Sequence, residues 1–261
     1  VTVTGPVVLG ADLTIDTDTA GTDGNISFTS TVDGTQALIL NADTGGDITV
    51  GGAIGSSIAV DALNFDGNNI SIANIGGAAA GVTGVTDINA VNQLTFTGTT
   101  YNANQATYTA AAGDNLLVNG GATTTYTATD DAIAFNTANI KLADGSDLVV
   151  TSGGGAITTL GIRGTSSEDV TLTSIGGTTN TVSVGAIGSG DEINTVALTG
   201  STSVTLNGNI TTSNAAGNNV TVTGPVVLGA DLTIDTDTAG TDGNISFTST
   251  VDGTQALILN A

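Results

Sequence analysis

Three aspartates lie close together near the beginning of the chain, in the segment DTDTAGTDG: Asp16, Asp18 and Asp23. Carboxylates gathered in a glycine-containing turn suit Ca²⁺, which takes six to eight oxygen ligands. Asp16 and Asp18 alternate along an extended segment, so their side chains are expected to face one side. The spacing of an EF-hand loop is not met, and a solvated acidic turn is the alternative interpretation. Ca²⁺ is therefore the only cofactor that the sequence suggests.

The chain contains few of the residue types that commonly act in catalysis. The chain has no His and no Cys, and its only basic residues are Lys141 and Arg163. A polysaccharide lyase would lack its usual base and its usual charge stabiliser. Paired carboxylates could in principle hydrolyse a glycoside, but no segment is long enough to build an evident pocket. We predict that the chain is not an enzyme, with a polysaccharide-acting β-helix as a disfavoured alternative.

The charge balance limits the partners. Against two basic residues stand 24 Asp and Glu, giving a net charge of −22. A nucleic-acid backbone and an anionic membrane surface both require clustered Lys and Arg. No apolar run approaches the roughly 20 residues that span a bilayer. We therefore expect neither nucleic-acid binding nor membrane insertion.

The composition predicts strands and turns. Hydrophobic residues make up 39% of the chain, mostly in short alternating runs, so disorder is not expected. Apolar residues at helical spacing are not sustained anywhere, and the polar helix formers are scarce. Thr, Val, Ile, Gly, Asn and Asp dominate, and these favour strands and turns.

A long exact repeat divides the chain. The segment 220–261 is identical to the segment 1–42, so the segment 1–219 forms one complete unit and the segment 220–261 begins the next. The three aspartates recur as Asp235, Asp237 and Asp242. We expect one continuous structure without a domain boundary at this point.

A shorter repeat, with a period of about 22, runs inside the unit. Segments such as NISF at Asn25, DITV at Asp47 and NISI at Asn69 share an amide or carboxylate, an apolar residue, a hydroxyl and a second apolar residue. Ten steps of this alignment complete the long unit. Its first apolar column is Ile26, Ile48, Ile70, Leu94, Leu116, Ile140, Ile162, Val182, Val204 and Val226.

One strand recurring at a fixed phase is typical of a coil of strands. Each turn would pair with the turns above and below it, about 4.8 Å away. The sequence therefore predicts an all-β, parallel β-solenoid, and right-handed crossovers favour a right-handed β-helix. Amide side chains before the strands would form a ladder between turns. A second sheet is expected at Leu38, Leu63, Leu148, Val170 and Val196.

Two features of the outward positions suggest interactions. Lys141 and Arg163 would stack on successive turns, with Asp144, Asp147, Glu168 and Asp169 offsetting their repulsion. They form either a docking point for an acidic neighbour or a local ion-pair cluster. Outward Ser and Thr suggest an ice-binding surface, although Leu117, Lys141, Arg163 and Val227 interrupt that column.

The segment GNISFTSTVDGTQALILNADTGGDITVGGAIG, residues 24–55, resembles the repeats of filamentous-haemagglutinin-type adhesins. These are giant bacterial surface proteins with parallel β-helical passengers. The clearest resemblance ends at about Phe65, and it carries over no catalytic or binding residue. It implies an exported protein at the bacterial cell surface, working in adhesion or as a fibre.

Together these features favour a structural repeat of a long extracellular fibre. Its partners would be further copies of the repeat, stacked end to end and associating laterally. The alternative is the stalk of a surface adhesin that presents a separate domain, which would bind a surface or a glycan.

Overall fold

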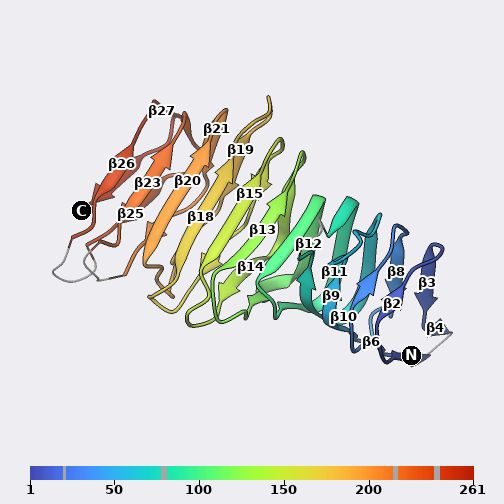
Figure 1. Ribbon diagram of the computed structural model, residues 1–261. Coiled ribbons are helices and arrows are strands. Elements are labelled where there is room, and N and C mark those ends of the chain that lie inside the picture. The colour runs from blue at the N-terminus through green and yellow to red at the C-terminus, as the bar shows by residue number, and fades with distance from the viewer. Residues whose placement is uncertain (20–21, 78–80, 214–216, 238–241) are drawn as a thin grey trace.

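The computed structural model describes residues 1–19, 22–77, 81–213, 217–237 and 242–261. Within these ranges the chain forms strands and turns without a helix, and so no helix that could cross a membrane. The strands stack side by side along one axis, from the N-terminal end in blue to the C-terminal end in red (Figure 1). Apart from one hairpin, every strand pairing of the described chain is parallel. The predicted parallel β-solenoid, of about ten turns, is confirmed.

Three strand ladders run along the solenoid, and we call them faces 1, 2 and 3 in the order in which the chain meets them. Face 1 is built from β1 (Thr2–Val3), β6 (Ile26–Phe28), the start of β9 (Ile48–Ile54), the later parts of β10 (Leu63–Ile75), β11 (Val82–Phe96), β12 (Thr100–Val118) and β14 (Ile133–Leu142), then β17 (Ile162–Arg163), β22 (Ile210–Thr211), β25 (Leu232–Asp235) and β28 (Leu257–Asn260).

Face 2 follows in each turn. It contains β2 (Val7–Val8), β7 (Val32–Asp33), the ends of β9 and β10, the start of β12, β13 (Thr124–Ala128), β15 (Leu148–Ser152), β18 (Asp169–Ser174), β20 (Thr195–Gly200), β23 (Val220–Thr223) and β26 (Ile245–Phe247).

Face 3 closes each turn. It contains β3 (Leu13–Asp16), β8 (Leu38–Asn41), the start of β10, the middle parts of β11 and β12, the start of β14, β16 (Ile157–Thr158), β19 (Thr181–Val184), β21 (Ser203–Leu206), β24 (Val226–Leu228) and β27 (Val251–Asp252). The predicted second sheet is therefore two sheets, because Leu38 and Leu63 lie on face 3 while Leu148, Val170 and Val196 lie on face 2.

The predicted apolar column is right as far as Ile162 and wrong beyond it. Ile162 stacks on Ile187, while Val182 stacks on Ile157 of face 3. From Ile26, nine stacking steps along face 1 lead to Ile234 through the residues Ile48, Ile70, Leu94, Leu116, Ile140, Ile162, Ile187 and Ile210. Ile245, the copy of Ile26, follows on face 2. One complete repeat unit thus advances the chain by nine turns and one further face, rather than by ten whole turns.

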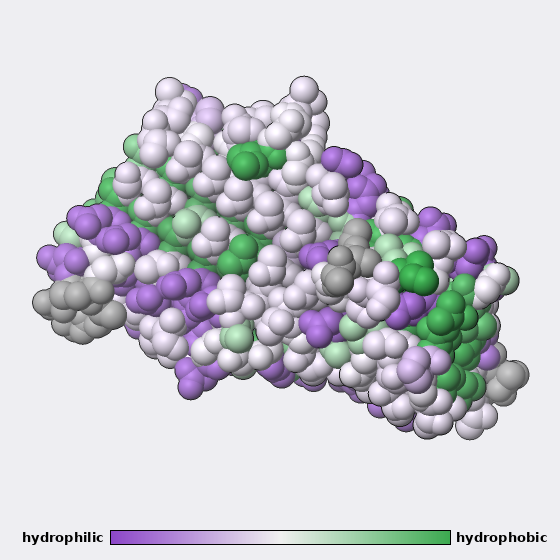
Figure 2. Space-filling model, viewed as in Figure 1, coloured by the Kyte–Doolittle hydropathy of each residue, from purple (hydrophilic) through white to green (hydrophobic). Residues whose placement is uncertain are grey.

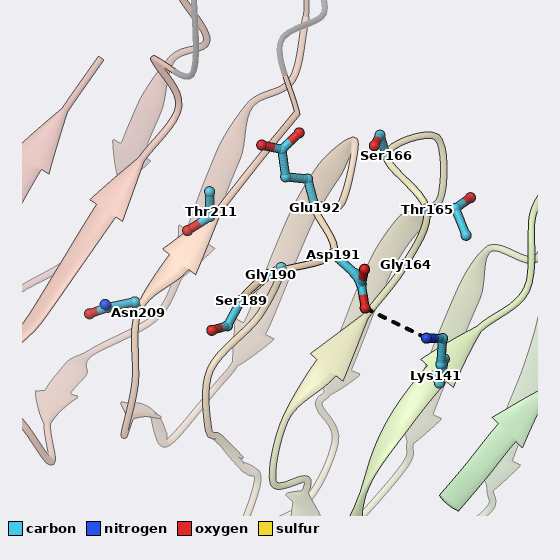
Figure 3. Close-up of a pocket in the computed structure, with 11 residues that line it drawn as sticks. Lys141, Gly164, Thr165, Ser166, Ser189, Gly190, Asp191, Glu192, Asn209 and Thr211 are labelled. Carbon is cyan, nitrogen blue, oxygen red and sulfur yellow. Dashed lines mark ion pairs between the residues drawn. The ribbon is translucent and has the colours of Figure 1, made fainter. Parts of the chain in front are cut away.

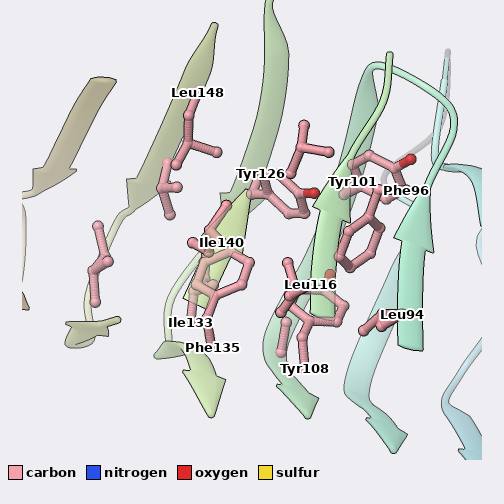
Figure 4. Packing of buried hydrophobic residues seen from close by; sticks show 14 of the residues in the cluster. Leu94, Phe96, Tyr101, Tyr108, Leu116, Tyr126, Ile133, Phe135, Ile140 and Leu148 are labelled. Atoms are coloured by element: carbon pink, nitrogen blue, oxygen red, sulfur yellow. The ribbon is translucent and has the colours of Figure 1, made fainter. Parts of the chain in front are cut away.

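The inward side chains form one aliphatic core along the axis, because alternate residues of every strand point inward. In the middle of the solenoid this core is aromatic (Figure 4). Tyr126 stacks against Tyr101 with ring centroids 4.7 Å apart and meets Phe96 edge-on at 5.2 Å. The Tyr101 hydroxyl donates to the carbonyl of Ala73 at 2.7 Å, so this ring also ties successive turns together.

Polar side chains link successive turns outside the core. Asn25 Oδ1 accepts the backbone N–H of Asp47 at 2.9 Å, and Asp47 Oδ1 accepts the Nδ2 of Asn69 at 2.8 Å. Asn69 Oδ1 accepts a hydrogen bond from Nδ2 of Asn92 at 2.8 Å, and not from the side chain of Gln93. The predicted ladder of amide side chains is therefore present from Asn25 to Asn69, with a carboxylate and a backbone group as members. Farther along the chain it is broken, because Asn115 Nδ2 donates to the carbonyl of Ala112 in its own turn.

The face of the molecule seen in Figure 2 is mostly white, the colour of intermediate hydropathy. Green, apolar side chains gather near the end of the molecule that carries the first turn. Val8, on β2 of the first turn, is 71% exposed.

Candidate functional site

The predicted calcium segment forms a hairpin that leaves the solenoid after face 3. β4 (Asp18–Thr19) and β5 (Thr22–Asp23) pair antiparallel, with Asp18 opposite Asp23. The base of the hairpin is closed by Thr17, whose hydroxyl donates to the carbonyl of Gly24 at 2.5 Å. Thr236 and Gly243 repeat this hydrogen bond in the second copy, at 2.9 Å. The same hydrogen bond therefore joins the two ends of this segment in both copies.

The structure describes the side chains of Asp16 and Asp23 but not that of Asp18. Asp16 is exposed at the end of β3, opposite Asn41, and Asp23 Oδ2 accepts the N–H of Gly45 in the next turn at 2.8 Å. The side chain of Asp18 lies outside the described part of the chain. Among the described residues, no group of three or more acidic side chains could hold a metal ion. Because Asp18 is not part of that set, calcium binding by the three aspartates stays a prediction.

In the second copy of the acidic segment, the structure describes all three aspartates but not the residues between Asp237 and Asp242. Asp235 Oδ1 accepts the Nδ2 of Asn260 and the N–H of Asp237, each at 3.0 Å. Asp237 and Asp242 are exposed. Residues 238–241, between them, lie outside the described part. A cation would therefore compete with an amide donor for the Asp235 carboxylate.

The two basic side chains stack as predicted, but their partners differ from those expected. Lys141 lies directly opposite Arg163 on face 1. Arg163 Nε reaches back past Lys141 to Asp114 Oδ1 at 3.3 Å, and Lys141 Nζ reaches forward past Arg163 to Asp191 Oδ2 at 3.6 Å. The two ion pairs cross, so each cation lies between carboxylates on both sides along the axis. This arrangement offsets the repulsion, and partly exposed pairs of this kind contribute about 0–1 kcal/mol each.

Sequence proximity suggested the wrong carboxylates for these cations. In the described chain, the ion pairs of Lys141 and Arg163 do not involve Asp144, Asp147, Glu168 or Asp169. Asp114 and Asp191 are instead two turns away from the cations that they pair with, and only the stacking register of face 1 brings them close.

A polar hollow of ≈510 Å³ opens beside the Lys141–Asp191 pair (Figure 3). It is lined by Lys141, residues 164–166, residues 188–192, Asn209 and Thr211. Every lining residue is polar or glycine, so the hollow suits a small hydroxylated or charged molecule better than an apolar one. Within this lining the carboxylate of Asp191 is paired with the ammonium group of Lys141.

Glu168 is the most enclosed carboxylate of the described chain, and it holds two adjacent turns together. Its side chain is fully buried. Its oxygens accept the N–H and the hydroxyl of Thr165, the hydroxyl of Ser167, and the N–H of Gly145 in the preceding turn. Burial raises the pKa of this carboxyl group, but the four hydrogen bonds outweigh burial and bring the pKa below its usual value. Glu168 is therefore a structural carboxylate rather than a proton donor near neutral pH.

Face 2 carries an uninterrupted outward column of threonines that the sequence alignment missed. Thr127, Thr151, Thr173, Thr199 and Thr223 are direct partners on successive turns. The neighbouring outward column is Thr125, Val149, Thr171, Ala197, Thr221 and Ser246. These two columns contain no charged residue, so they form a regular array of methyl and hydroxyl groups.

Comparison with known proteins adds no identification. No protein-family model matches the chain, and neither a curated protein nor a solved structure matches it.

Proposed function

We propose that the chain is a structural repeat of a long, rigid extracellular fibre in which successive repeats continue one solenoid. The observation that carries this proposal is the strand pairing across the repeat boundary. β23, β24 and β25 of the second copy pair with β20, β21 and β22, which precede that boundary. The new repeat thus adds its strands to the ladders of the previous one.

The physical character of the solenoid supports a mechanical role. Backbone hydrogen bonds run along the axis on all three faces, and the aliphatic core continues through the repeat boundary at Val222, Val226 and Ile234, all fully buried. Each repeat of nine turns and one face adds about 45 Å of length at the usual spacing between strands. A rod built in this way resists bending, because every turn packs on the next.

The composition supports a location outside the cell. Trypsin-like proteases find only Lys141 and Arg163 to cleave after, and the chain has no Met, Cys or Trp. It therefore lacks the side chains that are most easily oxidised. The rod would serve equally as a free fibre or as the stalk of a surface adhesin whose binding domain lies elsewhere, since a fold alone does not fix a function.

The experiment that tests this proposal is electron microscopy and fibre diffraction of a chain carrying several repeats. We expect straight rods that lengthen by about 45 Å per repeat, with a reflection near 4.8 Å along the rod axis. Compact particles, or rods whose length does not grow with the number of repeats, would overturn the proposal.

The threonine array favours a second candidate function, which is the ordering of water at an ice surface. The interruptions of the Ser and Thr column lie on face 1, at Leu117, Lys141 and Arg163, and on face 3, at Val227. The column on face 2 is unbroken from Thr127 to Thr223. Its hydroxyls recur about 4.8 Å apart along the axis and about 6.7 Å apart across it. Thermal hysteresis of the protein solution tests this function: a gap between melting and freezing points that vanishes in Thr173→Lys supports it, and no gap in the unsubstituted protein rejects it.

A further inference from the structure

The long repeat does not return to the face on which it began. We propose that successive repeats present the same surface on successive faces of the solenoid, so that the orientation recurs only after three repeats. The proposal of a fibre is the premise of this inference, which adds how the surface of the fibre is arranged around its axis.

The two copies have the same internal structure. Thr2 and Val3 lie opposite Ser27 and Phe28, just as Thr221 and Val222 lie opposite Ser246 and Phe247. Other pairs agree as well, including Val7 with Val32 and Val226 with Val251, and Leu13 with Leu38 and Leu232 with Leu257. The copy is therefore one fixed two-turn unit, and only its placement on the solenoid differs.

The placement of every strand that belongs to the three faces shifts by one face. β1 and β6 lie on face 1, and their copies β23 and β26 lie on face 2. β2 and β7 lie on face 2, and their copies β24 and β27 lie on face 3. β3 and β8 lie on face 3, and their copies β25 and β28 lie on face 1. Identical sequence thus occupies three different faces without a change of register.

The core makes this shift permissible. Each face presents alternating aliphatic side chains to the axis, so a strand finds similar neighbours on any face. Val222 stacks between Leu198 and Phe247 on face 2, and Val226 stacks between Val204 and Val251 on face 3. All of these inward positions take residues that differ in volume by a few methylene groups, which a core accommodates when total volume is kept.

The consequence concerns any partner of the fibre. A site that occurs once per repeat, such as the hollow beside Lys141 and Asp191, would face three directions in turn, each a third of a turn from the last and about 45 Å further along the rod. Partners would then surround the fibre instead of lining one side of it. Lateral contacts between rods would likewise be offered in three directions.

The register that produces the shift can be tested in this chain with pyrene attached to paired cysteines, since the protein has no Cys of its own. Thr158→Cys with Ser183→Cys places two labels on adjacent strands of face 3, about 4.8 Å apart at the backbone. Arg163→Cys with Ser183→Cys is the pair that a ten-turn register would bring together. Lys141→Cys with Arg163→Cys, which are true neighbours, is the positive control for position 163.

We expect excimer emission from the 158/183 pair and from the control pair, and monomer emission alone from the 163/183 pair. Excimer emission from the 163/183 pair, or its absence from the 158/183 pair, would overturn the proposal. Far-UV circular dichroism checks that each double variant keeps its strands. This result does not depend on fibre formation, so a chain that shows the expected pairs but builds no rods would refute the proposed function and leave the register intact.

Discussion

The segments 1–42 and 220–261 are identical in sequence, and they differ in which of their two turns is buried. In the first copy the second turn is inside the solenoid, with Phe28, Val32 and Leu40 all 0–1% exposed. In the second copy the equivalent positions are more exposed to solvent: Phe247 is partly buried, Val251 is 37% exposed and Leu259 is 51% exposed. The first turns behave in the opposite way, because β23, β24 and β25 are covered by the preceding strands.

This comparison separates what the local sequence decides from what the neighbouring turns decide. Local geometry is the same in both copies: Gly34 has φ +128° and Gly253 has φ +140°, each packed against a leucine of the preceding turn, Leu9 or Leu228. These values favour glycine, since a Cβ at Gly34 would lie 2.6 Å from the carbonyl oxygen of Leu9. Burial is set by the adjacent turns, as expected for a solenoid whose units contact only their neighbours.

The largest expected effect comes from truncating the phenylalanine of each copy. Phe28→Ala should lower the free energy of unfolding by about 3–5 kcal/mol, because it leaves a cavity in a closed core. In the 261-residue chain, Phe247→Ala should cost less than about 2 kcal/mol, because that ring is only partly buried. Chemical denaturation followed by circular dichroism measures both values. If both variants lost the same free energy of unfolding, the contribution of the ring would be set by the local sequence and not by the neighbouring turns.

For a residue of the first turn we expect the opposite order, with the larger loss of stability in the second copy. Ile234→Ala should cost about 2–5 kcal/mol, because Ile234 is fully buried between Ile210 and Leu259. Ile15→Ala, the matched substitution in the first copy, should cost roughly half as much or less, because Ile15 packs against the core on one side only. A larger loss for Ile15→Ala would show that the first copy is simply the more stable one.

A hydrogen-bonded carboxylate gives a third matched pair. Asp33 Oδ1 accepts the N–H groups of Ser57 and Ile58 in the next turn, at 2.8 and 3.1 Å. Asp33→Ala leaves these donors without that partner and should cost about 1–3 kcal/mol. Asp252→Ala, in an exposed copy, should change the unfolding free energy by less than about 0.5 kcal/mol. Thermal melts of the two variants provide the measurement, and a similar shift in both would count against the hydrogen-bond explanation.

Glu168 lies between the two copies in the sequence, and its contribution to stability should depend on pH. Its folded-state pKa is below the ordinary value of 4.5, so its contribution to stability is present above pH 4.5 and is lost as the pH falls through the folded-state pKa. Glu168→Gln should cost about 1–3 kcal/mol at pH 7, and the difference from the unsubstituted protein should shrink in acid. Melting curves between pH 7 and pH 2 test this, and a constant difference across that range would contradict it.

The smallest expected effect is that of calcium on the acidic segments of the two copies. Millimolar Ca²⁺ should raise the melting temperature by screening the charge of −22 or by binding at Asp16, Asp18 and Asp23. Asp23→Asn and Asp242→Asn compare the calcium response of the two copies. The comparison is informative because the Asp23 carboxylate already accepts a hydrogen bond from the N–H of Gly45 in the next turn. Calcium would be excluded as a ligand by melting curves that are identical with the ion and with a chelator.

The sequence was sufficient for the fold class and for the first part of the register. From Asn25 to Asn139 the motif keeps an amide or carboxylate before the strand and two apolar residues in it, so the turns can be counted. At Ile162 the second apolar position is Gly164, and the motif resumes more clearly at Thr181 than at Ile187, where the chain actually returns to face 1. All three faces share the alternating aliphatic pattern, so the pattern alone does not tell which face a strand joins.

The candidate sites depend on register even more strongly. Asp114 and Arg163 are separated by two turns, so their pairing follows only once the stacking is known. The threonine column of face 2 was hidden for the same reason, because Thr127 and Thr151 belong to segments that the face 1 motif does not include.

Helical reconstruction of a chain carrying three or more repeats measures the rotation between repeats. We expect a continuous solenoid across each repeat boundary, with each repeat advanced by about 45 Å. Each repeat should be rotated by one face, a third of a turn, in addition to the gradual twist of the sheets. Repeats that return to the same face after ten whole turns, about 48 Å apart, would contradict it.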